Sequence, residues 1–440
     1  MIVINPTKIR PVALVALTCI LAVPLPQAIA QEGSPVLYKV QSGDTLSGLV
    51  SRYLQGNDAL RQLVEFNAIS NPNAVPVGYS LKIPRQLLKH VPSSATVSRI
   101  NCTGITRQQG ETSSALKLGD EVQEGHVVRI PAGCQLALTL EDDSTLRMMS
   151  GSVIRFKALR RNALEVSPEV RVELLDGRIE ANVPRKRQDN DAPVEIRTTT
   201  SVAGVRGTEF RVAFDPSRQG SQVEVLTGVV AAQGSADAKE QLAKAGQGVA
   251  IAPDGKALPV EDLLAAPQYV DSQAGAGTEW VLRFNAPDLA KQLLVRQSED
   301  VSFAFLSASD ALTEPQLAVR NVGPNALYQQ WSSVSASGIV GYGQNYALCK
   351  PYKREDLWRC NVTFNLGGLT NPHLRLIKLD ASGQETTVLD KALPIEQNDQ
   401  LVLRGLPVGQ YKWHIESDLA PNRRTSQQGD FLLVAITPKS

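Results

Sequence analysis

The side chains of this 440-residue sequence best suited to chemistry are its cysteines, and their arrangement favours disulfide bonds. Cys102 and Cys134 lie in one half of the chain, and Cys349 and Cys360 lie in the other. Zinc would be the competing partner, but there is no C-x-x-C motif and the four histidines are scattered. We therefore predict Cys102–Cys134 and Cys349–Cys360 disulfides, with buried free thiols as the alternative, and no metal or other cofactor.

Catalytic signatures are missing from the sequence. There is no G-x-S-x-G, no P-loop and no H-E-x-x-H. Cys349 has no sequence context typical of a nucleophile, and the glycine-rich stretch 338–343 lacks the strand and helix that nucleotide binding needs. We predict that the protein is not an enzyme.

The composition is that of a folded chain with no preference for polyanions. Hydrophobic residues make up 42% and charged residues 20%, the formal net charge is +1, and the pI is about 7.6. A nucleic-acid-binding domain usually has a basic face and a high pI. We expect several folded domains and no nucleic-acid partner.

The first thirty residues have the order of a secretory signal peptide. Lys8 and Arg10 give a positive start, the stretch 12–23 is apolar but short for a membrane span, and Ala28–Ala30 places small residues before a cleavage point. We interpret 1–30 as a signal peptide removed before Gln31, which predicts export. An uncleaved anchor is the alternative.

Residues 36–86 have the pattern of a small unit with two strands and two helices. Val36–Val40 alternates as a strand does, and Tyr79–Ile83 forms a second strand that ends at a proline. Between them, apolar residues recur at helical spacing from Leu46 to Tyr53 and again from Leu60 to Phe66. The predicted order is strand, helix, helix, strand.

This unit resembles a LysM domain. The residues that carry the resemblance are Tyr38–Leu46, Asn67, Val77–Gly78 and Leu81–Pro84. The resemblance implies a βααβ fold that binds polymers containing N-acetylglucosamine, such as the glycan strands of peptidoglycan. It agrees with the element order predicted from the residue pattern.

A neutral, amide-bearing glycan is best held by backbone groups in a shallow groove, with an apolar contact for the acetyl methyl. The loops around 43–46 and 67–72 could supply these groups, although Asp44 and Thr45 could instead cap a helix and Leu46 could belong to the core. Substituting Asp44 and Asn67 together is expected to weaken binding. The predicted glycan-binding residues are Gly43, Asp44, Thr45, Leu46, Asn67, Ala68, Ile69 and Pro72.

After a polar stretch over 87–98, expected to be a linker, residues 100–252 consist of short apolar runs separated by turn signals such as Asp176-Gly177, which is typical of an all-β domain. This region resembles the FecR family, above all in Thr198–Phe210, with Leu174–Arg178 and Val225–Val230. The resemblance implies a β-rich fold and an extracytoplasmic location. Local pairing of Arg206 with Glu209 is expected to be structural.

Residues 253–277 are rich in proline and glycine and are expected to be a linker. The remainder contains two weakly similar halves, 278–350 and 351–440, each long enough for a small Ig-like β-sandwich. The predicted fold class is therefore mainly β and multidomain: a βααβ LysM module, an all-β FecR-like domain and a C-terminal β-sandwich region.

The sequence predicts a non-catalytic periplasmic protein that binds peptidoglycan and offers its β domains to a protein partner. Two alternatives stay open. One is a cell-wall turnover enzyme with an unrecognised site, and the other is an extracytoplasmic sensor for a membrane signalling partner.

The signal peptide gives a direct prediction about the mature protein. N-terminal sequencing should find Gln31 as the first residue of protein recovered from outside the cytoplasm, because signal peptidase reads the small residues at 28 and 30. A chain that begins at Met1, or one that carries lipid on Cys19, would contradict it.

Overall fold

The computed structural model describes residues 35–437, apart from 166, 185–193, 206, 238, 304–305, 355–356, 367–368, 394–399 and 421–422. The predicted signal peptide and Arg206 lie outside the described residues. The described chain is built mainly of strands in several sheets with two α-helices, which confirms the mainly-β prediction. Within these residues, none of the helices combines the length and apolar character that crossing a membrane requires.

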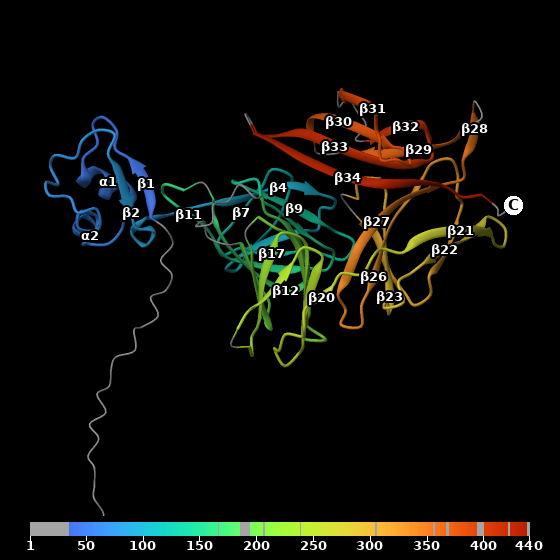
Figure 1. Ribbon diagram of the computed structural model, residues 1–440, viewed down its shortest axis with the longest axis horizontal. Coiled ribbons are helices and arrows are strands. Elements are labelled where there is room, and N and C mark those ends of the chain that lie inside the picture. The colour runs from blue at the N-terminus through green and yellow to red at the C-terminus, as the bar shows by residue number, and fades with distance from the viewer. Residues whose placement is uncertain are drawn as a thin grey trace, which may run out of the picture.

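The N-terminal module has the predicted βααβ order. Antiparallel strands β1 (Val36–Lys39) and β2 (Ser80–Ile83) flank helices α1 (Leu46–Tyr53) and α2 (Ala59–Phe66). One face of each helix packs on the sheet around the fully buried Leu63 and Leu81, which follows from the helical spacing of its apolar residues. Figure 1 shows the module at one end of the molecule.

The module is joined to the next domain by a short, hydrogen-bonded connection. After the 3₁₀ turn η1 (Arg85–Leu87), the amide of Lys89 donates to Tyr53 in α1 (2.8 Å), and the carbonyl of Lys89 accepts from Ala163 (3.0 Å). Arg85 forms an ion pair with Glu165. The connection is therefore bonded both to the LysM module and to the domain that follows it.

Residues 90–262 fold into two sheets that enclose one hydrophobic core. The first sheet runs in the order β6 (Thr112–Ala115), β5 (Thr106–Gln109), β8 (Val127–Arg129), β11 (Val153–Asn162), β12 (Glu169–Asn182), β13 (Val194–Arg197), β14 (Ser201–Val205), β17 (Val229–Gly234) and β18 (Gln241–Lys244), with β3 (His90–Pro92) also on β11. The second runs in the order β7 (Glu121–Gln123), β4 (Ser94–Ile100), β9 (Leu136–Leu140), β10 (Thr145–Met148), β12, β15 (Glu209–Asp215), β16 (Gly220–Thr227), β19 (Gln247–Ile251) and β20 (Glu261–Asp262).

Strand β12 belongs to both sheets and closes the structure. Its first part pairs with β11 and β13, and its second part pairs with β10 and β15. Asp176-Gly177, expected to be a turn, is instead the bend between the two parts. Gly177 has φ +87, and a Cβ there would lie 2.7 Å from the Cα of Ser152, so only glycine fits. The Ser152 hydroxyl bonds both backbone groups of Arg178 and fixes the bend.

The Cys102–Cys134 disulfide is present, with Cα atoms 5.7 Å apart. Cys102 follows β4, and Cys134 precedes β9. These two strands are antiparallel neighbours that pair up to Ile100 opposite Leu136. The bridge therefore closes the end of an existing ladder.

The C-terminal region is one eight-stranded sheet covered by two three-stranded sheets. The long sheet runs in the order β24 (Leu306–Leu312), β23 (Gln292–Ser298), β26 (Leu327–Val334), β27 (Val340–Cys349), β34 (Arg423–Ala435), β33 (Gly409–Ala420), β30 (Thr370–Leu379) and β31 (Glu385–Ala392). The covering sheets are β21 (Gln268–Ala274), β22 (Glu279–Asn285) and β25 (Gln316–Arg320), and β28 (Tyr352–Arg354), β29 (Leu357–Asn365) and β32 (Gln400–Pro407).

Each half of the long sheet has its own aromatic core. In the first half, Phe284 stacks on Trp331 at 3.6 Å between ring centroids. In the second half, Tyr411 stacks on Phe431 at 5.1 Å. The halves join where β27 and β34 pair in parallel, and the Cys349–Cys360 bridge, with Cα atoms 6.2 Å apart, lies fully buried beside this junction. The division into units 278–350 and 351–440 stays a proposal.

Two stretches expected to be linkers contain strands. Residues 87–98 carry β3 and most of β4, and residues 253–277 carry β20 and β21. Strand β4 alternates buried and half-buried residues, with Ala95 and Val97 in the core. Its serines and threonine lie on the outer face, which is why the stretch is polar overall.

Removing the first disulfide should lower stability more than removing the second. The first bridge closes a separation of 32 residues and the second closes one of 11, so the loop-entropy argument gives losses of about 4 and about 3 kcal/mol in the free energy of unfolding. Denaturant unfolding of paired Cys→Ala variants measures both losses.

Non-reducing peptide mapping of the wild-type protein checks the pairing itself. A bond between Cys134 and Cys349, or four thiols open to alkylation, would contradict it.

Candidate functional site: the LysM loops and the interdomain charge cluster

The two loops predicted to bind glycan emerge from the same end of the β1–β2 sheet. Beyond the ladder, Val40 and Tyr79 stay hydrogen-bonded (N to O, 3.0 Å), and the amide of Gly78 donates to Val40 (2.8 Å). The loop 41–45 leaves β1 at this point, and the loop 67–79 arrives at β2 there. The topology therefore brings the two predicted segments to one edge of the module.

Asp44 holds the first loop in shape. One carboxylate oxygen, Oδ2, accepts hydrogen bonds from the backbone amide of Gln41 and from the Tyr38 hydroxyl, each at 2.8 Å, and Arg52 lies 4.0 Å from the other oxygen. The bonds from Gln41 and Tyr38 lower the pKa of the Asp44 carboxyl. Burial and the contact with Asp44 raise the pKa of Tyr38 to about 12. The Asp44 side chain is thus an ionised internal anchor.

Asn67 joins the end of α2 to β2. Its side-chain oxygen accepts from the amide of Lys82 at 2.7 Å, and its side-chain nitrogen donates to the carbonyls of Lys82 (2.7 Å) and Leu63 (2.8 Å). Because these bonds engage the side-chain amide, substituting Asn67 or Asp44 tests the shape of the loops as much as contact with a glycan.

Two further predicted residues also serve the fold. The Thr45 hydroxyl accepts from the amide of Gly48 at 3.0 Å and caps α1. Leu46 is 4% exposed and belongs to the core, which agrees with the alternative interpretation given for this residue in the sequence.

The remaining predicted residues form the accessible part of the loops. Gly43, Ala68 and Pro72 are exposed, and Ile69 is half-buried. Val77, which carries part of the LysM resemblance but was not predicted to bind glycan, is 67% exposed beside Gly78 on the same edge. Its signal was an apolar residue next to a turn glycine. Small residues and Pro72 therefore share this accessible surface with polar residues such as Ser70 and Asn71.

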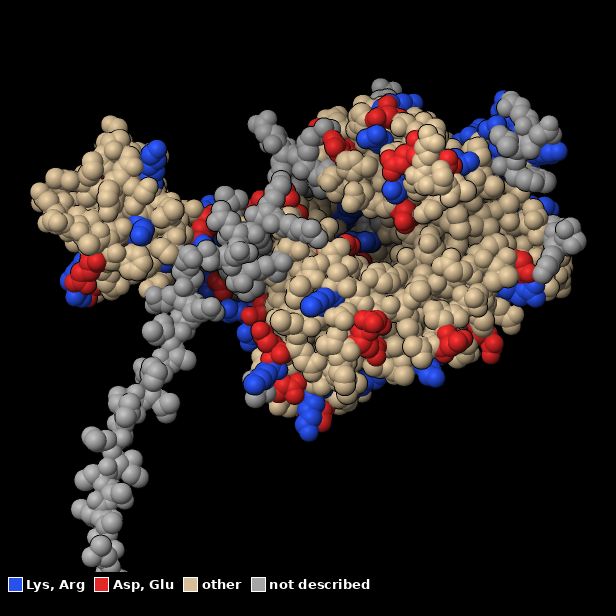
Figure 2. All heavy atoms as spheres, in the orientation of Figure 1, with Lys and Arg blue, Asp and Glu red and all other residues tan. Residues whose placement is uncertain are grey.

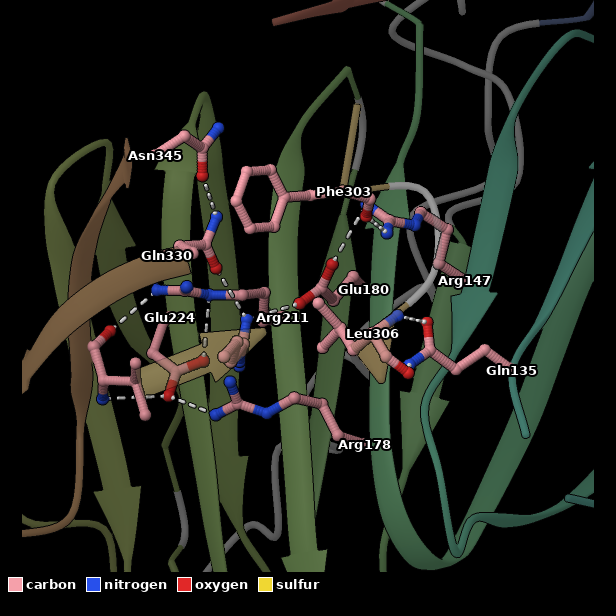
Figure 3. Close-up of polar contacts among 12 residues, drawn as sticks. Gln135, Arg147, Arg178, Glu180, Arg211, Glu224, Phe303, Leu306, Gln330 and Asn345 are labelled. Carbon is pink, nitrogen blue, oxygen red and sulfur yellow. Dashed lines mark hydrogen bonds and ion pairs between the residues drawn. The ribbon is translucent and has the colours of Figure 1, made fainter. Parts of the chain in front are cut away.

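A second notable site is a cluster of buried charges between residues 90–262 and the C-terminal region (Figure 3). Glu224 in β16 is fully buried and lies 2.9 Å from Arg178 and 3.3 Å from Arg211. The same carboxylate accepts from the amide of Val340 in β27 at 3.1 Å, and Arg211 donates to the carbonyls of Val340 and Gly341 at 2.7 and 3.1 Å. Charged side chains of one domain thus form hydrogen bonds with backbone groups of the other.

The second carboxylate of the cluster belongs to Glu180 in β12. It lies 3.3 Å from Arg296 in β23 and 3.5 Å from Arg147 in β10. Arg147 also donates to the carbonyl of Phe303 at 2.9 Å, and Arg296 donates to Gln330 in β26 at 3.2 Å. The cluster therefore crosses the interface in both directions.

The electrostatics of Glu180 follow from its neighbours. Burial alone would raise the pKa of its carboxyl, but four arginines together overcome burial and lower the pKa to about 2. These arginines are Arg147, Arg296, Arg211 and Arg178. Burial lowers the pKa of Arg296 to about 10, and the guanidinium remains charged at neutral pH.

The segment that carries the FecR resemblance also has a structural role. The hydroxyls of Thr198 and Thr200 each lie 2.7 Å from the hydroxyl of Ser221, which is fully buried in β16. Thr198 also lies 2.9 Å from the Ser201 hydroxyl in β14. This hydroxyl cluster connects the two sheets of the domain. The expected Arg206–Glu209 pair falls on Arg206, outside the described residues.

Comparison with known proteins defines the class of the two N-terminal units. The LysM domain family matches residues 38–84, and the FecR protein family matches residues 126–231. The chain therefore contains a LysM domain and a FecR domain, as the sequence predicted. No curated protein sequence matches it significantly.

Among solved structures, two crystal structures of a candidate anti-sigma factor from Parabacteroides distasonis ATCC 8503, at 2.50 and 1.65 Å resolution, are similar to part of the chain. Each is 20% identical, with a TM-score of 0.26, and the match covers 31% of this chain and 59% of the other.

Acid should weaken the fold through Glu180. Because its folded pKa of about 2 lies below its ordinary value of 4.5, it contributes stability above pH 4.5 that is lost as the pH falls towards 2. The loss should reach about 3 kcal/mol in the free energy of unfolding. Denaturant unfolding at several pH values measures it.

Glu180→Gln is the matched control, since it removes the titrating group. It should be less stable than the wild type at pH 7 and should approach the wild type near pH 2. Equal pH profiles for the two proteins would contradict this assignment.

Proposed function

We propose that this chain is a non-catalytic, exported protein that binds peptidoglycan through its LysM domain and presents its β domains to a protein partner. The observation that carries the proposal is the edge of the LysM module where both loops meet the sheet, with Gly43, Ala68 and Pro72 exposed. Such a surface suits a neutral acetamido sugar, which offers hydroxyl and amide groups and no charge. One module of this kind is expected to bind weakly.

The site residues are proposed in two roles. Gly43, Ala68, Ile69 and Pro72, with Val77, would contact the glycan. Asp44, Thr45, Leu46 and Asn67 would shape the loops, as their hydrogen bonds and burial indicate.

Three observations favour a binding role over catalysis. A lytic wall enzyme would need a carboxylate in a cleft beside the bound glycan, but in the LysM module Glu65 of α2 is 64% exposed and lies 3.6 Å from Arg61 on the surface. The buried carboxylates Glu180 and Glu224 are each held by arginines. Across the described part of the chain, no three metal-ligating side chains gather to hold a metal ion.

The two disulfides support an oxidising location such as the periplasm. The alternative role as an extracytoplasmic sensor is favoured by the FecR match. Recovery of a membrane signalling protein in a pull-down with the full chain would favour it over a purely structural role.

Wall binding can be tested in the full mature chain by co-sedimentation with purified peptidoglycan. Ala68→Glu and Pro72→Glu, both at exposed loop positions, should together lower the sedimented fraction about fivefold or more, because a charge would be desolvated against a neutral glycan. Gln62→Glu adds one charge of the same sign on an exposed face of α2 and should leave sedimentation unchanged.

Equal sedimentation of the loop variant and the wild type would place the binding site elsewhere. A zymogram on peptidoglycan should show no cleared band. A cleared band would overturn the non-catalytic assignment.

A further inference from the structure

A polar cavity of about 720 Å³ lies between the FecR domain and the second half of the C-terminal region. Figure 2 shows a hollow between the two bodies with charged side chains inside it. One wall is the outer face of β4 and β9, with Ser98 and Thr139, and the other is formed by β33 and β34, with Trp413 and Gln427. The volume lies within the range of small-molecule sites, roughly 300–1,000 Å³.

The walls are fixed to each other by Arg99. This side chain from β4 is 7% exposed and donates to the side-chain oxygen of Gln427 at 2.6 Å and to the carbonyl of Asn365 at 3.2 Å. The cavity is thus pre-formed, because a charged group from one body is bonded to two elements of the other.

Thr139 lines this space. It is 2% exposed and lies on the face of β9 opposite the core residues Leu138 and Leu140. Its Oγ1 has no hydrogen-bond partner among the described residues, although a buried hydroxyl ordinarily has one. A polar group of a ligand bound in the cavity would supply the missing hydrogen-bond partner.

Trp413 also lines the cavity and carries a second unpartnered polar atom. Its ring meets Phe364 edge-on and lies over Gly429 on the next strand, where a Cβ would come within 2.8 Å of the indole. Trp413 is 5% exposed, and its Nε1 has no hydrogen-bond partner in the described part of the structure. The missing side chain at Gly429 makes room for the indole, and both residues line the cavity.

The charges of the lining exclude a polyanion as the natural occupant. Positive and negative side chains balance: Arg99, Arg147 and Lys412 against Glu209, Asp418 and Asp430. Hydroxyl and amide side chains supply most of the other lining residues, and Ala137 and Leu369 add small apolar areas. Such a mixture bonds hydroxyl groups and accepts C–H faces, with little net attraction for charge.

We propose that this cavity binds a neutral, hydroxyl-rich saccharide of about disaccharide size, with the Thr139 hydroxyl and the Trp413 N–H as hydrogen-bonding partners. The site is separate from the LysM loops and does not depend on their role. It gives the FecR domain and the C-terminal region a shared small ligand, so its occupancy stabilises their contact.

Isothermal titration calorimetry on the full chain tests the proposal with N,N′-diacetylchitobiose, cellobiose and inorganic phosphate as probes. The protein carries Ala68→Glu and Pro72→Glu throughout, so that the LysM loops do not contribute. At least one disaccharide should bind and phosphate should not. Thr139→Val and Trp413→Phe should each weaken disaccharide binding about 3- to 10-fold, the effect of one lost hydrogen bond.

Thr96→Val is the matched control, because Thr96 lies opposite Thr139 on β4 but does not line the cavity. It should leave disaccharide binding unchanged. Thermal unfolding should show that Thr139→Val keeps the stability of the parent, since its hydroxyl has no hydrogen-bond partner among the described residues. Absence of disaccharide binding, binding that both cavity variants retain in full, or binding of phosphate instead would each overturn the proposal.

Discussion

The arrangement of the large β body depends on the carboxylate of Glu224. It lies fully buried between Arg178 and Arg211 and accepts the amide of Val340 from the C-terminal region. Removing one member of such a group leaves an uncompensated charge out of water, which costs about 3–5 kcal/mol. The interface therefore favours one relative position of the two bodies. In that position, charged side chains of one body meet backbone groups and charges of the other, and any shift would leave several buried charges without partners.

The cavity and the buried charge cluster both arise because charged side chains hold the two bodies together. Two domains that met through a flat apolar surface would exclude water and close completely. Here the contacts are made by long side chains such as Arg99 and Arg147, which hold the bodies in register while they leave space between them. A polar, pre-formed hollow is a natural result of joining two sheets through arginines.

The sequence predicted the parts of the fold that depend on local patterns. The LysM order followed from helical and strand periodicity, and both disulfides followed from the local pairing of cysteines in an exported chain. Strand β4 was missed because its outer face is rich in Ser and Thr, and the alternation of Ala95 and Val97 was hidden among them. Gly177 was taken for a turn, although it marks a bend inside one long strand.

The site was predictable only in outline. The loops were assigned to glycan binding by family resemblance, and that role stays a prediction. Hydrogen bonding decides whether Asp44 and Asn67 face a ligand or the loop itself, and that depends on partners as distant as Lys82. The charge cluster left no local signal, because Glu180, Glu224 and Arg296 are far apart in the chain and each looks like an ordinary surface residue within its strand.

The position of β34 in the long sheet sets the order in which the C-terminal region can assemble. It follows every other strand of that sheet in the chain, yet it lies in the middle, between β27 and β33. While the chain emerges from a ribosome or a translocation channel, the two halves can collapse around their own aromatic residues, but the seam between them stays open until residues 423–435 arrive. A truncation that removes this segment would expose two strand edges at once, and these edges would be open to pairing with other chains.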